Sequence, residues 1–123
     1  MNNLILSSTS ITGTNVTNQK GENLGEIKDL MIDTESGRVN YAVLSFGGFL
    51  GLGDKYFAIP FEAFSVNTTT EKFVLNVSKD RLENAPGFDK DNWPKTNDHT
   101  YWNNLYTHYG VERRSTQTQR QSA

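Results

Sequence analysis

Residues 21–64 read GENLGEIKDLMIDTESGRVNYAVLSFGGFLGLGDKYFAIPFEAF and hold most of the β-forming side chains of the chain. Two runs with strand character, residues 24–33 and 38–46, stand on either side of the polar segment Asp33-Thr34-Glu35-Ser36-Gly37. That segment contains residues that favour turns, and Gly37 is well placed to adopt a positive φ. The stretch therefore predicts a β-hairpin at the centre of the fold.

Each arm of this hairpin departs from simple alternation of apolar and polar residues. In the first arm the apolar side chains change face at Lys28-Asp29, which indicates a bulge or a strand that is covered on both faces. The second arm begins half-buried and ends with apolar side chains on both faces, from Ala42 to Phe46. Another element must therefore cover the outer face of the second arm.

The rest of the chain predicts further short strands separated by turns. A first strand is expected around residues 14–17, another at residues 55–59 before Pro60, and two more in residues 60–67 and 71–78. Ser78 can cap a helical turn that ends near residue 84. Turn signals at short spacing without βαβ alternation predict a mainly β fold, a small barrel of about six short antiparallel strands with a short helical turn and a C-terminal aromatic helix.

The C-terminal helix is predicted over residues 99–109, after an extended connector that contains two prolines. Asp98 can cap its start, and Gly110 stands where glycine favours the end of a helix. Its large side chains recur at helical spacing and form one apolar stripe: Tyr101, Trp102, Leu105, Tyr106 and Tyr109. A helix this short is marginal alone in water, so the stripe must dock on its own strands or on those of a neighbouring chain.

The composition predicts one folded body with polar ends. Hydrophobic residues make up 35% of the chain and the mean hydropathy is −0.62. The expected organisation is a loose lead at residues 1–13, a barrel at 14–84, the connector and helix at 85–110, and a disordered polar tail at 111–123. The apolar run at residues 4–6 is too short for a signal peptide or a membrane span, so the chain is expected to be cytoplasmic.

No set of residues in the chain has the spacing of a catalytic or metal site. There is no cysteine, and His99 and His108 stand at opposite ends of the predicted helix. The glycine-rich residues 47–55 lack the Ser or Thr that follows lysine in a phosphate-binding loop, and Trp93 occupies a ligand position of a calcium-loop pattern. We therefore predict no enzyme activity, no catalytic residue, no cofactor and no metal.

The expected activity is protein–protein interaction, with the chain itself as one partner and an unidentified protein as another. The candidate contact residues are the apolar side chains of the glycine-rich loop, one connector aromatic and the helix stripe: Phe49, Leu50, Leu52, Trp93, Tyr101, Trp102, Leu105, Tyr106 and Tyr109. The net charge of −2 argues against nucleic acid as the main partner. The alternative is an anion or nucleic-acid binder that uses the connector aromatics and the arginines of the tail, Arg113, Arg114 and Arg120.

The order K-G-E-N-L-G-E-I-K-D-L-M-I-D, then G-R-V-N-Y-A-V-L-S-F-G-G, then K-Y-F-A-I-P-F resembles the PRC-barrel family. That family is named for the cytoplasmic domain of the photosynthetic reaction centre H subunit, and a similar barrel ends the small-subunit ribosome maturation factor. The resemblance covers about half of the chain and continues in P-G-F-D-K-D-N-W-P and the closing Tyr-Gly, which are similar to the extension of stand-alone bacterial members.

The resemblance implies a barrel that acts as an adaptor, whose partners differ from one protein to the next. It implies no catalytic residue, because the shared pattern consists of turn glycines, apolar strand residues and the Ile59-Pro60 strand end. Neither a transmembrane helix nor an RNA-binding domain precedes the barrel in this sequence, so neither attachment to a photosystem nor a ribosomal role is expected.

Overall fold

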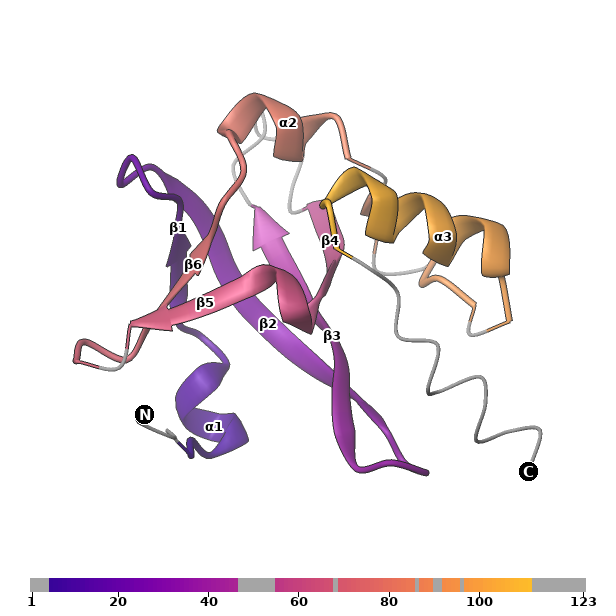
Figure 1. Cartoon of the computed structure of the whole chain (residues 1–123), viewed down its shortest axis with the longest axis horizontal. Helices are drawn as coiled ribbons and strands as arrows, with labels where there is room; N and C mark the ends of the chain where they lie inside the picture. The colour runs from indigo at the N-terminus through magenta and orange to yellow at the C-terminus, as the bar shows by residue number, and fades with distance from the viewer. Residues whose placement is uncertain are drawn as a thin grey trace.

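The computed structural model describes residues 5–46, 55–67, 69–85, 87–89, 92–95 and 97–111. The elements succeed one another in this order: α1 (Ser8–Ile11), β1 (Asn15–Thr17), β2 (Asn23–Asp33), β3 (Arg38–Phe46), β4 (Lys55–Pro60), the 3-10 helix η1 (Phe61–Ala63), β5 (Phe64–Asn67), β6 (Lys72–Leu75), α2 (Lys79–Glu83), β7 (Gly87–Phe88) and α3 (His99–His108). The long hairpin of β2 and β3 crosses the middle of the molecule, and α2 and α3 lie on one side of it (Figure 1). The predicted mainly β fold with a C-terminal helix is confirmed.

The strands form one mixed sheet in the order β5-β6-β1-β2-β3-β4-β7. In the described residues three details differ from the prediction: the sheet has seven strands where about six were expected, β1 pairs with β6 in parallel, with Val16 opposite Phe73, and the sheet does not close into a barrel. The described strands form an open ladder that ends at β5 and β7. The chain runs through four other strands between β1 and β6, so no local turn signal marks their pairing.

The central hairpin has two register shifts, and the first lies where the sequence indicates a bulge or a strand covered on both faces. Ile27 pairs with Leu44 and Asp29 pairs with Val43, so Lys28 is the extra residue of a bulge. The turn contains Gly37 with a φ of +75°, as expected. Because the bulge resets the alternation, apolar side chains on both sides of Lys28 can contribute to one packed body.

Gly25 brings β2 and β3 unusually close together. Its φ is +119°, and a Cβ atom built on it would lie 2.3 Å from the carbonyl oxygen of Ser45. Such a distance is far below van der Waals contact with a backbone atom, so only glycine fits at this position.

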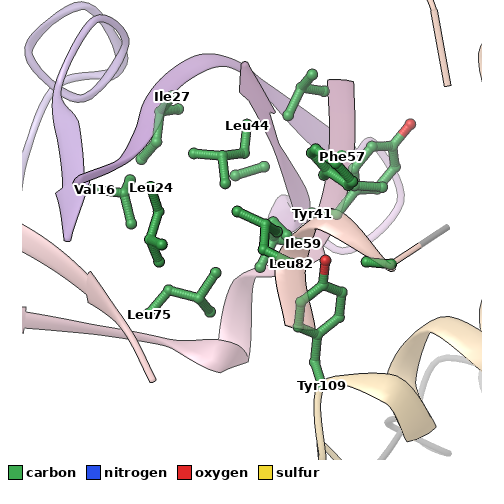
Figure 2. Close-up of a cluster of buried hydrophobic side chains, with 14 of the residues drawn as sticks. Val16, Leu24, Ile27, Tyr41, Leu44, Phe57, Ile59, Leu75, Leu82 and Tyr109 are labelled. Carbon is green, nitrogen blue, oxygen red and sulfur yellow. The ribbon is translucent and has the colours of Figure 1, made fainter. Parts of the chain in front are cut away.

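The apolar core fills one side of the sheet and continues across β3. Ile27, Leu44 and Phe57 stand side by side on three neighbouring strands and are fully buried, and Figure 2 shows them gathered with other core side chains. Every residue of β3 from Tyr41 to Phe46 is buried, which confirms that the second arm is covered on both faces. The cover on the outer face comes from the C-terminal part of the chain, where Trp102 lies against Tyr41.

The tip of the central hairpin extends beyond its neighbours in the sheet. β1 pairs with β2 only as far as Glu26, and β4 pairs with β3 only from Tyr41 onward. Residues 28–40, here called the distal hairpin, therefore project as a two-stranded ribbon, which Figure 1 shows reaching away from the body. A two-stranded ribbon is marginally stable in water, so its exposed side chains are of interest.

Candidate interaction surfaces

Helix α3 packs against the chain's own sheet beside β4. The carboxylate of Asp98 accepts a hydrogen bond from the Tyr101 amide at 3.1 Å, and Gly110 stands just after the helix with a φ of +68°. Both helix signals in the sequence therefore work as predicted. β7 pairs with β4 only at Tyr56 and Phe57, so α3 lies against a strand that β7 leaves partly uncovered.

Four side chains of the aromatic stripe are buried inside this docked arrangement: Trp102, Leu105, Tyr106 and Tyr109. The Trp102 ring lies 4.9 Å from the Tyr41 ring, centroid to centroid, and its indole nitrogen donates a hydrogen bond to the Lys95 carbonyl at 2.9 Å. Figure 2 shows the Tyr109 ring directed from α3 into the core cluster. Of the two docking alternatives, the structure has the stripe on its own strands.

Hydrogen bonds between Arg81 and His108 connect α2 to the end of α3. The Nε atom of Arg81 donates a hydrogen bond to the His108 carbonyl at 3.2 Å, and a second guanidinium nitrogen donates to the same oxygen. The Nε2 atom of His108 lies 3.1 Å from the Arg81 carbonyl oxygen. A cationic group at the C-terminal end of a helix satisfies a carbonyl that has no partner within the helix. The tie therefore helps to hold the aromatic stripe in place.

Trp93 and Tyr101 are the two predicted contact residues that the structure leaves half-buried. The Trp93 ring packs on Phe88 at 5.1 Å and on Tyr56 at 6.2 Å, and Lys28 Nζ lies 5.5 Å from the centroid of the Tyr56 ring. This packing accounts for the connector aromatics without a nucleobase. Whether either half-buried side chain contacts a partner stays a prediction.

The other predicted contact residues, Phe49, Leu50 and Leu52, lie outside the described residues. So do Arg113, Arg114 and Arg120 of the predicted tail.

Sequence reasoning did not single out the distal hairpin as a candidate contact surface. Ile32 is 55% exposed there, and three apolar neighbours are half-buried: Leu30, Met31 and Val39. The run Leu30-Met31-Ile32 could have indicated this surface. Successive side chains in a strand point to opposite faces, so three apolar residues in a row cannot all face the same side. A contiguous exposed apolar patch can mark a protein–protein interaction site, and the patch here has one exposed side chain with half-buried neighbours.

The distal hairpin carries side chains of both charges. Residues 28–40 contain three acidic side chains, one lysine and one arginine, a net charge of −1. Asp29 and Glu35 are exposed, and Arg38 stands opposite Asp33. The surface therefore combines an apolar centre with charges of both signs.

Two tyrosine hydroxyls beneath α3 are buried without a hydrogen-bond partner among the described residues, those of Tyr101 and Tyr109. Burial raises the pKa of Tyr101 to about 12, and nearby Tyr41 and Asp98 act in the same direction. Burial also raises the pKa of Tyr109, against a smaller opposing effect of Arg81. Both hydroxyls therefore stay neutral well above the range in which an exposed tyrosine ionises.

The variant Tyr109→Phe should raise the free energy of unfolding at pH 7 by about 1 kcal/mol, because it removes a buried hydroxyl without a partner. The advantage should grow above about pH 10, where tyrosines of the unfolded chain ionise while the raised pKa keeps Tyr109 protonated in the fold. Ionisation of Tyr109 in the unfolded chain stabilises the unfolded state. The free energy of unfolding of the wild type therefore falls as the pH rises from the usual pKa of tyrosine through the raised pKa of Tyr109. Guanidinium unfolding at pH 7 and about pH 11 measures both effects.

Tyr56→Phe serves as the control for this prediction, because Tyr56 is only half-buried and its hydroxyl is not among the buried atoms without a partner. Its stability should change little at pH 7. A loss of stability in Tyr109→Phe at pH 7 would show that the hydroxyl of Tyr109 is hydrogen-bonded after all.

The described residues contain no group of three His, Asp or Glu side chains that could hold a metal ion. None of the helices in the described part of the chain is long and apolar enough to cross a lipid bilayer.

Comparison with known families adds one finding. A sequence model of the PRC-barrel domain matches residues 5–82, which is more than half of the chain. The matched range runs from the start of the described residues to α2 and includes the distal hairpin, while α3 lies beyond it. No curated protein matches the chain.

Proposed function

The chain belongs to the PRC-barrel domain family, and on that premise we propose that it is a non-catalytic interaction module that self-associates through the distal hairpin. PRC-barrel domains are in general non-catalytic. The fold supports such a role, because one ribbon projects from its sheet.

The exposed side chain of Ile32 is the observation that carries the proposal. An isoleucine that is 55% exposed leaves much apolar surface in water, and its transfer into an interface is favourable by about 25 cal/mol per Å². Its cross-strand neighbour Val39 is half-buried and stands directly opposite on β3. The pair forms the centre of a small apolar patch.

The buried position of the aromatic stripe on α3 also favours the distal hairpin as the interface. Trp102, Leu105 and Tyr109 are already packed within the chain, so a partner that used them would first have to displace α3. The distal hairpin is available without rearrangement. In a two-fold dimer the same patch of each copy meets the other, so two hairpins supply one continuous apolar contact.

The experiment that tests this proposal is multi-angle light scattering across a wide concentration range. The average mass should exceed the 13.9 kDa of one chain and rise with concentration. Ile32→Ser should raise the dissociation constant about tenfold, because it removes most of the apolar side chain from the patch centre.

Ile5→Ser is the matched control, because Ile5 is also an exposed isoleucine, at 93%, but lies far from the hairpin in sequence. Its dissociation constant should equal that of the wild type. A wild-type mass of one chain at every concentration would refute self-association, and equal effects of the two variants would remove the distal hairpin from the interface.

A further inference from the structure

We propose that the outer edges of β2 in two copies of the chain pair with each other as antiparallel strands, so that one sheet runs through the dimer. The inference rests on the proposed self-association and deepens it, because it names the backbone groups by which the two distal hairpins bind. The paired residues are 29–33, the part of β2 that lies beyond its contacts with the preceding chain. A strand edge without a neighbour is a template for a further strand.

Within the residues that the structure describes, the outer edge of β2 has no backbone partner beyond Ile27. Its backbone hydrogen bonds with the preceding chain join the Ile27 amide to the Thr14 carbonyl at 3.0 Å and the Gly13 amide to the Ile27 carbonyl at 2.7 Å. The pairing of β1 with β2 ends at Glu26. The edge formed by residues 29–33 is therefore accessible to another strand.

The hydrogen bonds of Leu30 and Asp33 show which backbone groups face outward. The Leu30 amide donates to the carboxylate of its neighbour Asp29 at 2.9 Å, so it is not used in the ladder with β3. The Asp33 carbonyl accepts a hydrogen bond from the Gly37 amide at 2.7 Å, inside the hairpin. Because the backbone groups of successive strand residues point to opposite edges, Leu30 and Ile32 turn theirs outward.

The run Leu30-Met31-Ile32 is complementary to itself in an antiparallel pairing. A two-fold axis at Met31, perpendicular to the sheet, sets Met31 opposite its own counterpart and Leu30 opposite Ile32 of the other copy. The outward groups of Leu30 and Ile32 then form two sets of hydrogen bonds. Ile32, which is 55% exposed in one chain, gains an apolar side chain directly opposite. This match favours a second copy of the chain over a segment of unrelated sequence.

The charged residues beside the run allow this pairing and limit its strength. Asp29 of one copy stands opposite Asp33 of the other, and like charges opposite each other on paired strands are destabilising. Arg38 lies opposite Asp33 on β3 and offsets part of this repulsion. The Leu30 amide must also leave the Asp29 carboxylate before it bonds to the other copy. Asp29 therefore lowers the affinity between the two copies.

Cysteine cross-linking tests the pairing directly, because the chain has no cysteine of its own. Residues directly opposite on antiparallel strands have Cα atoms about 4.5–5.5 Å apart, which a disulfide spans, whereas diagonal neighbours lie about 7–8 Å apart. Met31→Cys should therefore give a cross-linked dimer on mild oxidation. Leu30→Cys and Ile32→Cys should each cross-link poorly alone, and a mixture of these two variants should give a cross-linked heterodimer.

Glu35→Cys is the matched control for cross-linking. Glu35 is exposed in the turn of the same hairpin but lies outside the paired residues, so this variant measures disulfides that form by random collision. Circular dichroism of each reduced variant checks that the fold is intact before oxidation.

A charge change tests the predicted place of Asp29. Asp29→Lys should lower the dissociation constant about fivefold, because it replaces two repulsions of Asp33 by attractions and frees the Leu30 amide. Glu35→Lys makes the same change of charge outside the paired residues and should alter the dissociation constant by less than about twofold. Sedimentation equilibrium gives both values. Equal effects of the two variants would overturn the inference.

The outcomes separate this inference from the proposed function. A wild-type dimer in which Met31→Cys cross-links no more than Glu35→Cys overturns the inference alone and leaves the proposed function in place. Cross-linking of Ile32→Cys alone also overturns the inference, because the two apolar patches would then meet face to face. A wild-type monomer at every concentration refutes both proposals.

Discussion

Gly25→Ala should reduce the free energy of unfolding by at least about 3 kcal/mol, and we expect the variant to be largely unfolded at 37 °C. The added methyl group would lie 2.3 Å from the Ser45 carbonyl oxygen and 3.3 Å from the Phe46 Cα atom. Both contacts are with backbone, so no side chain can rotate to relieve them. The φ of +119° adds further strain for any residue with a Cβ atom.

Gly37→Ala is the control for this effect. Gly37 also has a positive φ, +75°, but a Cβ atom there meets nothing within 4 Å. Gly37→Ala should lower the free energy of unfolding by about 1 kcal/mol, because of the backbone conformation alone. Chemical unfolding followed by circular dichroism gives both values. Equal losses in the two variants would show that the close approach of β2 to β3 at Gly25 contributes nothing beyond the conformational strain.

Trp102→Ala should cost about 3–5 kcal/mol, the range found when a large buried aromatic residue is truncated. Trp102 is 7% exposed, packs on Tyr41 with the two rings tilted, and donates a hydrogen bond to the Lys95 carbonyl. Its loss therefore removes a contact with the sheet and one with the connector. A ten-residue helix is not stable alone in water, so α3 should lose its structure when it detaches.

Hydrogen exchange and chemical unfolding measure this second effect. Amides of α3, and those of β3 near Val43, should exchange faster in Trp102→Ala, because the helix no longer covers the outer face. Asn104→Ala, on the exposed side of the same helix, should change stability by less than about 0.5 kcal/mol. A comparably small change in Trp102→Ala would mean that the docked helix contributes little to the fold.

Local signals in the sequence predicted the local structure well. The hairpin turn at Gly37 and the caps Ser78 and Asp98 depend on interactions between residues a few positions apart, and each is present in the structure. The bulge at Lys28 is one of the two alternatives that the sequence indicated. Such features can be derived from the sequence because backbone sterics and side-chain hydrogen bonds act over a few residues.

Features that depend on distant neighbours could not be derived in this way. The exposure of Ile32 depends on where β1 and β4 end, which its own strand does not reveal. The parallel contact of β1 with β6 joins segments with no turn between them. The docking of Trp102 on Tyr41 was one of two alternatives that the apolar stripe alone left equal. In each case the decisive quantity is the three-dimensional position of another element.

The pairing of β1 with β6 also has a consequence for the order in which the chain can assemble. Val16 and Phe73 are partners, yet they stand 57 positions apart in the sequence, so β1 leaves the ribosome long before β6 has been synthesised. Until then β1 can pair only with β2, and the side chain of Val16, which is buried in the finished fold, lacks the cover that β6 provides. Contacts between such distant residues slow folding, because a long loop must close before the contact stabilises it. The arrival of β6 beside β1 should therefore be a late step of folding.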